Sequence, residues 1–409
     1  MQKRIDLLWL IILAAGTILA INMGIRQTFG LYLKPVTQDL GVSREVFSLS
    51  IALLNLLWGF GSPFAGALSD KFGALWVLLV GAALYVVGLI VMATASGEGG
   101  LIVSGVLIGL GVAGSGISAV LGVVGRAAPP EKRQLALSLT SMGSAIGQFV
   151  ALPYVHVLID GTGWVTSLFV LAMTAAVMAP LGFALSRAVP RSGAPGNGPA
   201  AAPEQRMGAA LVEAMGHPSF LLLTAGFFVC GFQLAAVGVH LPAFLSDKGF
   251  DPSLAVIALT VVGLMNIAGT YLCGRAGEVM PKRVVLTLIY LARGTVFLAL
   301  LYIPLTETRV ILYAALLGFL WLGTIPLTSG LIVTFFGPRW LSTLYGIVFL
   351  SHQVGSFLGA WLGGWFYDLY QSYDRLWWVS IGVSLMAAVL HLPIREVPSA
   401  RLRALAAAE

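Results

Sequence analysis

The sequence predicts an all-α integral membrane protein whose twelve transmembrane helices form two six-helix bundles. Three observations predict this fold class: the composition, the number of long apolar runs and an internal repeat. Of the 409 residues, 58% are hydrophobic and 10% are charged, whereas a soluble protein carries about 25% charged residues. The composition therefore excludes a soluble globular enzyme and a disordered chain. The net charge is +6, but the basic residues are scattered singly, so no nucleic-acid partner is expected.

The apolar runs set the number of helices, because roughly 20 apolar residues are needed to cross a bilayer as a helix. Twelve such runs cover residues 8–33, 46–68, 75–95, 101–124, 135–158, 164–186, 219–245, 253–273, 284–304, 310–335, 341–366 and 376–394. The first run is too long for a cleaved signal peptide, and no small-residue cleavage site precedes the second.

The distribution of Lys and Arg predicts the topology. With the N-terminus inside, the inner segments hold sixteen of these residues and the outer loops hold five. Because positive charge accumulates in cytoplasmic loops, both termini are expected in the cytoplasm. The protein is expected in the inner (plasma) membrane of the cell.

A polar segment divides the chain in the middle. Residues 187–217 contain RSGAPGNGPAAAPEQ, a composition typical of a linker that has little to bury. We therefore expect an N-terminal bundle over 1–186, a cytoplasmic linker over 187–217 and a C-terminal bundle over 218–409.

The two halves are repeats of one another. With an offset of 208 residues, Asp39 falls on Asp247 and Asp160 falls on Asp368. Glycines at 41, 66 and 147 likewise fall on glycines at 249, 274 and 355. A repeat that spans an even number of helices predicts pseudo-two-fold symmetry about the membrane normal, with a substrate site between the halves near the midplane.

The segment GALSDKFG at 66–73, together with twelve spans and a long middle loop, resembles the major facilitator superfamily. The likeness covers the whole chain, and the segment matches that family's G-x-L-a-D-r-x-G motif. The resemblance implies that Asp70 latches the cytoplasmic side, with Arg126 as a candidate partner and Glu278 as the weaker copy of the motif in the second half.

Charged groups inside the spans predict the kind of solute, because they are costly in lipid and mark pathways. No Asp or Glu lies in the middle of a span, but Arg26 and Arg293 lie within spans. Arg26 offers a planar fork that matches a carboxylate, and Asn22 lies one turn earlier; the alternative is an arginine that reaches the outer interface. Arg293 is interpreted as structural, bonding carbonyls of neighbouring helices.

Two histidines are candidates for carrying a proton, because histidine titrates near neutral pH and no buried acid is available. His352 lies near the middle of its span, on one face with Tyr345, Phe349 and Ser356, and His240 ends its span as second choice. The alternatives are a helix-packing role for His352 and a capping role at the outer surface for His240.

Other polar and aromatic side chains recur on helix faces and are candidates for lining the cavity, or equally for bonding helices to one another. With Arg26, Asn22 and His352, they complete the predicted substrate-binding set: Asn55, Trp58, Gln148, Gln233, Asn266, Trp321 and Thr324.

Within the superfamily, the chain resembles the monocarboxylate transporters and the oxalate–formate antiporters. NMGIRQTFGLYLKPV places Arg26 where monocarboxylate transporters carry a lysine, and LYGIVFLSHQVGSFLGAWLGGWFYD places His352 close to the lysine that oxalate–formate antiporters use. The sequence departs from these relatives at Asn266 and Thr270, which stand where monocarboxylate transporters carry an Asp and an Arg.

These observations predict a secondary active transporter that moves a small organic anion by alternating access, coupled to protons as a symporter. An anion exchanger and an exporter of a neutral or amphiphilic compound remain alternatives. No motif of an enzyme or of an ATP-driven pump is present in the sequence, so we expect no enzymatic activity, no cofactor and no metal. We expect a monomer in the lipid bilayer.

Overall fold

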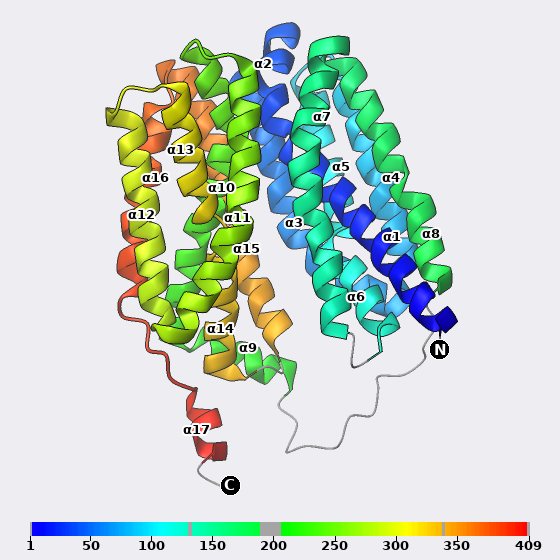
Figure 1. Ribbon diagram of the computed structural model, residues 1–409, viewed down its shortest axis with the longest axis vertical. Coiled ribbons are helices and arrows are strands. Elements are labelled where there is room, and N and C mark those ends of the chain that lie inside the picture. Colours follow the sequence, from blue (N-terminus) through cyan, green and yellow to red (C-terminus); the bar gives the residue numbers. More distant parts are fainter. Residues whose placement is uncertain (1, 130–132, 189–205, 338–339, 407–409) are drawn as a thin grey trace.

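The computed structural model describes residues 2–129, 133–188, 206–337 and 340–406. The secondary structure of these residues is helical, with no strand among them (Figure 1). The helices are α1 (Gln2–Gln27), α2 (Phe29–Leu40), α3 (Arg44–Phe72), α4 (Ala74–Ala93), α5 (Glu98–Gly114), α6 (Ile117–Ala127), α7 (Arg133–Ala176), α8 (Met178–Ala188), α9 (Met207–Met215), α10 (Pro218–Asp247), α11 (Pro252–Val279), α12 (Lys282–Tyr302), α13 (Glu307–Phe319), α14 (Thr324–Phe336), α15 (Leu341–Tyr370), α16 (Asp374–His391) and α17 (Ala400–Ala406).

The predicted twelve-helix fold is confirmed. Nine stretches of the described chain are long and apolar enough to cross a membrane. One of them, Leu139–Leu185, holds two crossings, because α7 breaks at Gly163, where φ is 80° and ψ is 164°. Glycine adopts this left-handed region without steric cost. The helices α15 and α16 supply the remaining crossings.

Four crossings are each interrupted between two helices. α1 passes into α2 at Thr28, α5 into α6 at Ser115 and Gly116, α7 into α8 at Val177, and α13 into α14 over residues 320–323. A break at membrane depth frees backbone N–H and C=O groups, which must be satisfied inside the protein. Polar side chains within the spans are therefore expected to bond to the backbone groups at these breaks.

The internal repeat is present in the packing as well as in the sequence. A Cβ atom on Gly147 would lie 2.0 Å from the carbonyl oxygen of Ala20, and one on Gly355 would lie 2.0 Å from that of Phe228. Ala20 and Phe228 are themselves 208 residues apart. The same close helix contact thus occurs once in each half, as the predicted pseudo-two-fold symmetry requires.

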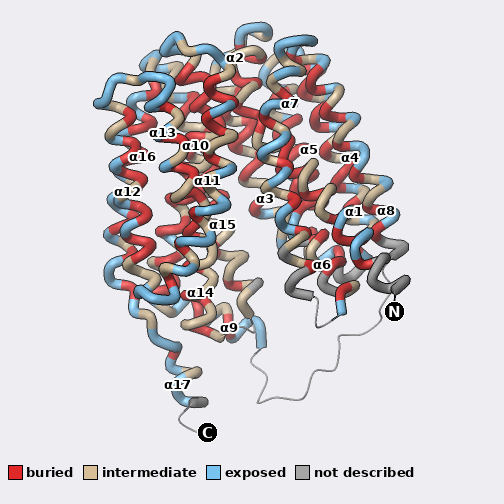
Figure 2. Tube along the Cα trace, in the orientation of Figure 1, coloured by how far each residue is buried: buried red, intermediate tan, exposed pale blue. Residues whose placement is uncertain are grey.

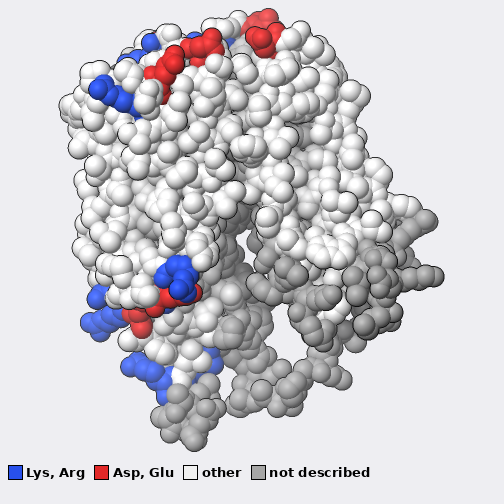
Figure 3. All heavy atoms as spheres, viewed as in Figure 1, with Lys and Arg blue, Asp and Glu red and all other residues white. Residues whose placement is uncertain are grey.

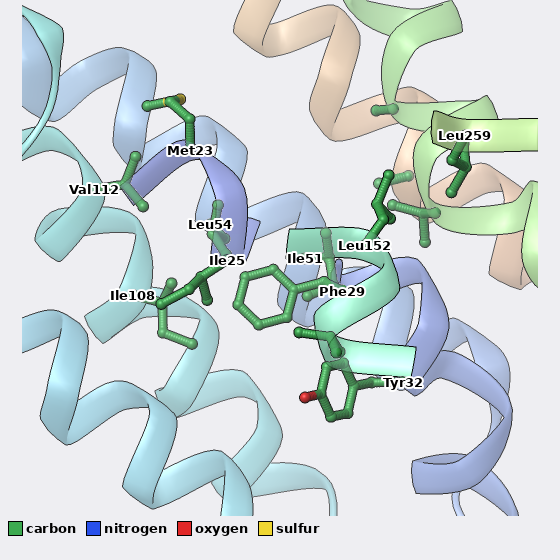
Figure 4. Close-up of a cluster of buried hydrophobic side chains, with 14 of the residues drawn as sticks. Met23, Ile25, Phe29, Tyr32, Ile51, Leu54, Ile108, Val112, Leu152 and Leu259 are labelled. Atoms are coloured by element: carbon green, nitrogen blue, oxygen red, sulfur yellow. The ribbon is translucent and has the colours of Figure 1, made fainter. Parts of the chain in front are cut away.

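The helices before and after the linker form two groups that lie side by side, and the start of α1 and α17 lie at the same end of the molecule (Figure 1). We call this the terminal end and the opposite one the distal end. Buried residues are spread through the helices of both groups (Figure 2). One core cluster contains residues of both groups, and Figure 4 shows part of it, with Phe29 and Ile51 from the first group and Leu259 from the second.

The surface carries charge at its two ends. On the face seen in Figure 3, acidic and basic side chains gather at the distal and terminal ends and leave an uncharged band between them. Large apolar side chains such as Leu13, Phe64 and Val157 are exposed, as expected where helices face lipid chains. The predicted linker contains the short helix α9, which the sequence analysis did not predict, and residues 189–205 lie outside the described part of the chain.

Candidate functional site

The site begins with Arg26, which ends α1 just before the break into α2. Its Nη2 donates to Asn55 Oδ1 on α3 at 2.5 Å, and its guanidinium carbon lies 4.6 Å from the centroid of the Trp58 ring. Its Nε–H is buried and finds no acceptor in the described part of the protein. No acidic side chain of the described residues forms an ion pair with Arg26, so its Nε–H is left as a free donor.

The side chains of Asn55 and Trp58 are fixed by their own contacts. Asn55 Nδ2 donates to the Ile51 carbonyl at 2.9 Å, which turns Oδ1 toward Arg26. Trp58 packs edge-on against Phe349 of α15, with ring centroids 5.2 Å apart. The structure thus brings together three of the predicted substrate-binding residues, and it adds α15 of the second half as the opposite wall.

His352 lies on α15, and 7% of it is exposed. Its ring stacks on Phe349 at 5.7 Å and lies 5.2 Å from the ring of Phe227 on α10. Its Nδ1 is 3.0 Å from Gln353 Oε1. Gln353 Nε2 in turn donates to the Asn55 carbonyl at 3.1 Å, so hydrogen bonds join His352 to the Arg26 site across the two halves.

Gln353 was absent from the predicted set. The predicted face of this span holds Tyr345, Phe349, His352 and Ser356, and Gln353 lies beside that face. It is fully buried, and Ser356 Oγ also donates to its Oε1 at 3.4 Å. The only feature of the sequence that could have pointed to Gln353 is a glutamine within an apolar span.

Asn22 bonds to the α5–α6 break. Its Nδ2 donates to Ser115 Oγ at 2.7 Å and to the Val112 carbonyl at 3.4 Å, and its own carbonyl accepts from Tyr85 Oη at 3.1 Å. These contacts hold α1 against α4 and α5. Asn22 therefore supports the helix that carries Arg26, while its amide group is directed to the break.

A second polar cluster surrounds Arg293 of α12 inside the second half. Arg293 is 2% exposed, and its Nη2 donates to the Leu320 carbonyl at 2.6 Å and to the Trp321 carbonyl at 2.5 Å. Its Nη1 donates to Gln233 Oε1 at 3.2 Å. The two carbonyls are those released where α13 ends, so Arg293 makes the predicted bonds to carbonyls of a neighbouring helix.

Other predicted residues also serve this helix break. Thr324 begins α14, and its Oγ1 lies 3.5 Å from Cys230 Sγ. Gln233 Nε2 donates to Ser384 Oγ of α16 at 2.5 Å. Asn266 Oδ1 accepts the backbone N–H of Leu322 at 3.0 Å. The polar groups of these side chains, with the Trp321 carbonyl, are bonded within the second half.

Gln148 and the predicted latch residues lie elsewhere. Gln148 is half-buried on α7. Asp70 and Arg126 belong to α3 and α6, but their side chains lie outside the described residues. Glu278 forms an exposed ion pair with Arg275, three residues earlier on α11, so its described contact is local.

His240 lies on α10 toward the distal end and is fully buried. Its Nε2 is 2.7 Å from the Ala360 carbonyl, and its ring lies 5.3 Å from that of Tyr373. Because a carbonyl only accepts, Nε2 carries the proton. Nδ1 is buried and has no partner in the described part of the protein.

The two halves are joined at the distal end by a group of charges that we call the distal gate: Lys34, Arg44, Glu45, Asp247 and Asp368. Asp247 of α10 pairs with Lys34 at 3.0 Å and with Arg44 at 2.5 Å. Asp368 of α15 accepts the backbone N–H groups of Arg44 at 3.1 Å and Glu45 at 2.6 Å, where α3 begins.

The distal gate closes one end of the boundary between the halves. Trp361 Nε1 adds a further bond to Glu45 Oε1 at 3.0 Å. Below the middle of the molecule, toward the terminal end, the surface is hollowed between the two halves (Figure 3). The sequence pattern marks Asp247 and Asp368 as part of the repeat and does not predict these bonds between the halves. Arg26 thus lies on a boundary that is closed by charged contacts at its distal end.

Comparison with known proteins gives concordant results. The Major Facilitator Superfamily model matches residues 15–360. Monocarboxylate transporter 13 of Rattus norvegicus is 26% identical over 388 residues, which cover 93% of this chain and 86% of the rat protein.

Two solved structures have a fold similar to that of this chain. A bacterial homologue of the human lysosomal transporter Spinster, in an inward-facing and unoccupied conformation, has a TM-score of 0.80 and 16% identity, covering 94% of this chain and 96% of that one. A D-xylose–proton symporter has a TM-score of 0.70 and 14% identity, covering 97% of this chain and 98% of that one.

Proposed function

The chain belongs to the Major Facilitator Superfamily, and from that premise we propose that it moves a small, monocarboxylate-like organic anion across the membrane by alternating access, as a proton symporter. The observation that carries the proposal is Arg26: a guanidinium with a buried, unpartnered Nε–H and no acidic partner among the described residues. An uncompensated buried charge is costly, and a carboxylate would both accept the free Nε–H and offset the charge. The monocarboxylate transporters among the relatives support the same class of solute.

In this proposal the anion binds between α1, α3 and α15. The carboxylate accepts from Arg26, whose orientation Asn55 fixes, and the apolar remainder lies against the Trp58 and Phe349 rings. Charge-assisted bonds of this kind are roughly twice as strong as neutral ones. The site therefore favours a small anion with one apolar face.

His352 is the proposed proton carrier, with His240 as second choice. Protonation of His352 adds a second positive charge to the same boundary, and a bound anion favours that charged form. Proton and anion then load together by reciprocity of the two binding equilibria. His240 donates from Nε2 to a carbonyl and lies near the distal gate.

The orientation in the membrane is part of the proposal. The terminal end, with both termini and the linker, faces the cytoplasm, and the distal gate faces the outside of the inner (plasma) membrane. With the gate closed, the Arg26 site is open to the cytoplasm. Asp70 and Arg126 are proposed to latch the opposite state.

The test is flux into proteoliposomes with four radiolabelled anions (L-lactate, pyruvate, formate and oxalate) and one lipophilic cation, tetraphenylphosphonium. We expect anion accumulation when the outside is acidic. Anion-for-anion exchange without gradient-driven uptake would assign an exchanger instead. Transport of the cation without any anion would reject the anion site.

Two substitutions assign the roles. Arg26→Gln is expected to weaken anion binding about ten- to hundredfold, since it removes bonds to a charged group, while Arg309→Gln is the matched control because Arg309 is exposed and bonded to the Pro304 carbonyl. His352→Gln is expected to lose gradient-driven uptake and to keep exchange. Wild-type affinity in Arg26→Gln would contradict the anion contact.

A further inference from the structure

Gln353 makes hydrogen bonds on both sides of the boundary between the halves. Its Oε1 lies 3.0 Å from His352 Nδ1 on its own helix, and its Nε2 donates to the Asn55 carbonyl on α3 at 3.1 Å. Asn55 also holds Arg26 through its side chain. The chain His352–Gln353–Asn55–Arg26 therefore links the proposed proton carrier to the proposed anion contact.

The bond to Asn55 fixes the orientation of the Gln353 amide. A backbone carbonyl only accepts, so the atom facing Asn55 is the donating –NH₂, and the atom facing His352 is the oxygen. His352 Nδ1 must then be the donor. Neutral His352 is the tautomer that carries its proton on Nδ1, and Nε2 is the nitrogen left to take up a second proton.

The backbone geometry holds Gln353 in this position. A Cβ atom on Gly59 of α3 would lie 2.6 Å from Gln353 Cβ, so the two helices approach closely at this point. The Gln353 side chain is fully buried, and Ser356 Oγ donates to the same oxygen at 3.4 Å. Both the Gln353–Asn55 bond and the Asp368 bonds of the distal gate join α15 to α3, so a separation of these two helices at the gate would also strain the Gln353–Asn55 bond.

We propose that Gln353 is a positioning residue that couples the charge on His352 to closure of the distal gate, so that protonation of His352 at Nε2 favours the closed gate. This inference deepens the proposed function and rests on His352 as its proton carrier. The imidazolium has one added proton and one added charge, which strengthens the Nδ1–H bond to Gln353. The polarised amide then donates more strongly to the Asn55 carbonyl.

Few other ionisable groups face this ring. From α10 the Cys230 thiol interacts with it, and Arg293 of α12 contacts that thiol at 3.8 Å. On α15 itself Tyr345 packs against Phe227, which also contacts the ring. From the first half the linked cation is Arg26. No acidic side chain among the described residues forms part of this chain of hydrogen bonds.

The experiment measures the distance between the halves at the distal end as a function of pH, without any substrate. Spin labels on Thr162→Cys and Thr306→Cys, both exposed, report opening and closing of the gate by pulsed electron resonance. Cys230 and Cys273 are buried and stay in place. The full-length protein in lipid nanodiscs is compared at about pH 8 and about pH 5, on either side of the usual histidine titration.

We expect acidification to raise the ratio of closed to open molecules about fivefold, the gain from charging one hydrogen bond. Gln353→Met, which keeps the length and removes the bonds to His352, Ser356 and Asn55, is expected to abolish this shift. Gln38→Met, at an exposed position on α2, is the matched control and should keep it.

Two results would overturn the proposal: a wild-type protein without an acid-induced shift toward closure, or a Gln353→Met variant that keeps the shift. His352→Asn provides a second variant if Gln353→Met does not fold, because its amide replaces the Nδ1–H donor and cannot be protonated. It should be insensitive to pH, and an unchanged shift in it would also reject the proposal. Since no transported solute is needed, failure of this experiment is distinct from failure of the anion flux assay.

Discussion

Asp368→Asn is the substitution that most directly tests how the two halves are held together. Asp368 belongs to the second half, yet its carboxylate accepts the first two backbone N–H groups of α3 in the first half, at 3.1 and 2.6 Å. Ser43 Oγ accepts the third, from Val46 at 3.2 Å. The first turn of α3 is therefore capped largely from across the boundary.

The expected loss follows from the bonds. An N-terminal cap contributes about 0.5–2 kcal/mol, and a negative charge at a helix N-terminus adds about 0.3–1 kcal/mol. Asparagine keeps one neutral acceptor and loses the charge and the second acceptor. We expect the closed gate to lose about 1.5–2 kcal/mol, which lowers the ratio of closed to open molecules about ten- to thirtyfold.

The label pair at residues 162 and 306 measures this ratio directly. Asp160→Asn is the matched control, because Asp160 occupies the equivalent position in the repeat, 208 residues earlier, and is exposed. We expect the control to keep the wild-type distribution. Equal distributions in Asp368→Asn and wild type, with both proteins folded, would refute the argument that this cap holds the gate.

Two further predictions concern residues away from the gate. Arg293→Met leaves the Leu320 and Trp321 carbonyls without their buried donor. We therefore expect the protein to lose about 3 kcal/mol in stability and to melt at a lower temperature in detergent. An unchanged melting temperature would contradict the structural role of Arg293. Asp70→Asn is expected to slow transport turnover with little change in equilibrium binding, whereas Glu278→Gln should have little effect because Glu278 pairs locally with Arg275; normal turnover in Asp70→Asn would count against the latch.

The fold could be predicted from the sequence because membrane helices must satisfy their backbone internally and be apolar over a fixed length. The constant offset between Asp39 and Asp247, and between Asp160 and Asp368, showed the repeat before any contact was known. The prediction did not include α9, because its nine residues lie in a segment whose composition is typical of a linker.

The site was predictable in part for the same reason. Arg26, Asn55 and Trp58 are costly or bulky groups within spans, and they meet as expected. Helix periodicity selects a face of one helix but does not say which helix that face contacts. Gln353 was therefore missed beside His352, and Gln233 bonds to α16 and Arg293 within its own half.

The close contacts at Gly147 and Gly355 have a consequence for how the solute specificity of such a transporter evolves. At each contact the backbones touch with no side chain between them, so the packing of each helix pair depends on its glycine. The wall of the proposed solute site is built from other positions, such as Trp58 and Phe349. Substitutions at those positions change the lining of the proposed site and leave the glycine contacts unchanged. The helix packing and the selectivity for a solute can therefore evolve separately.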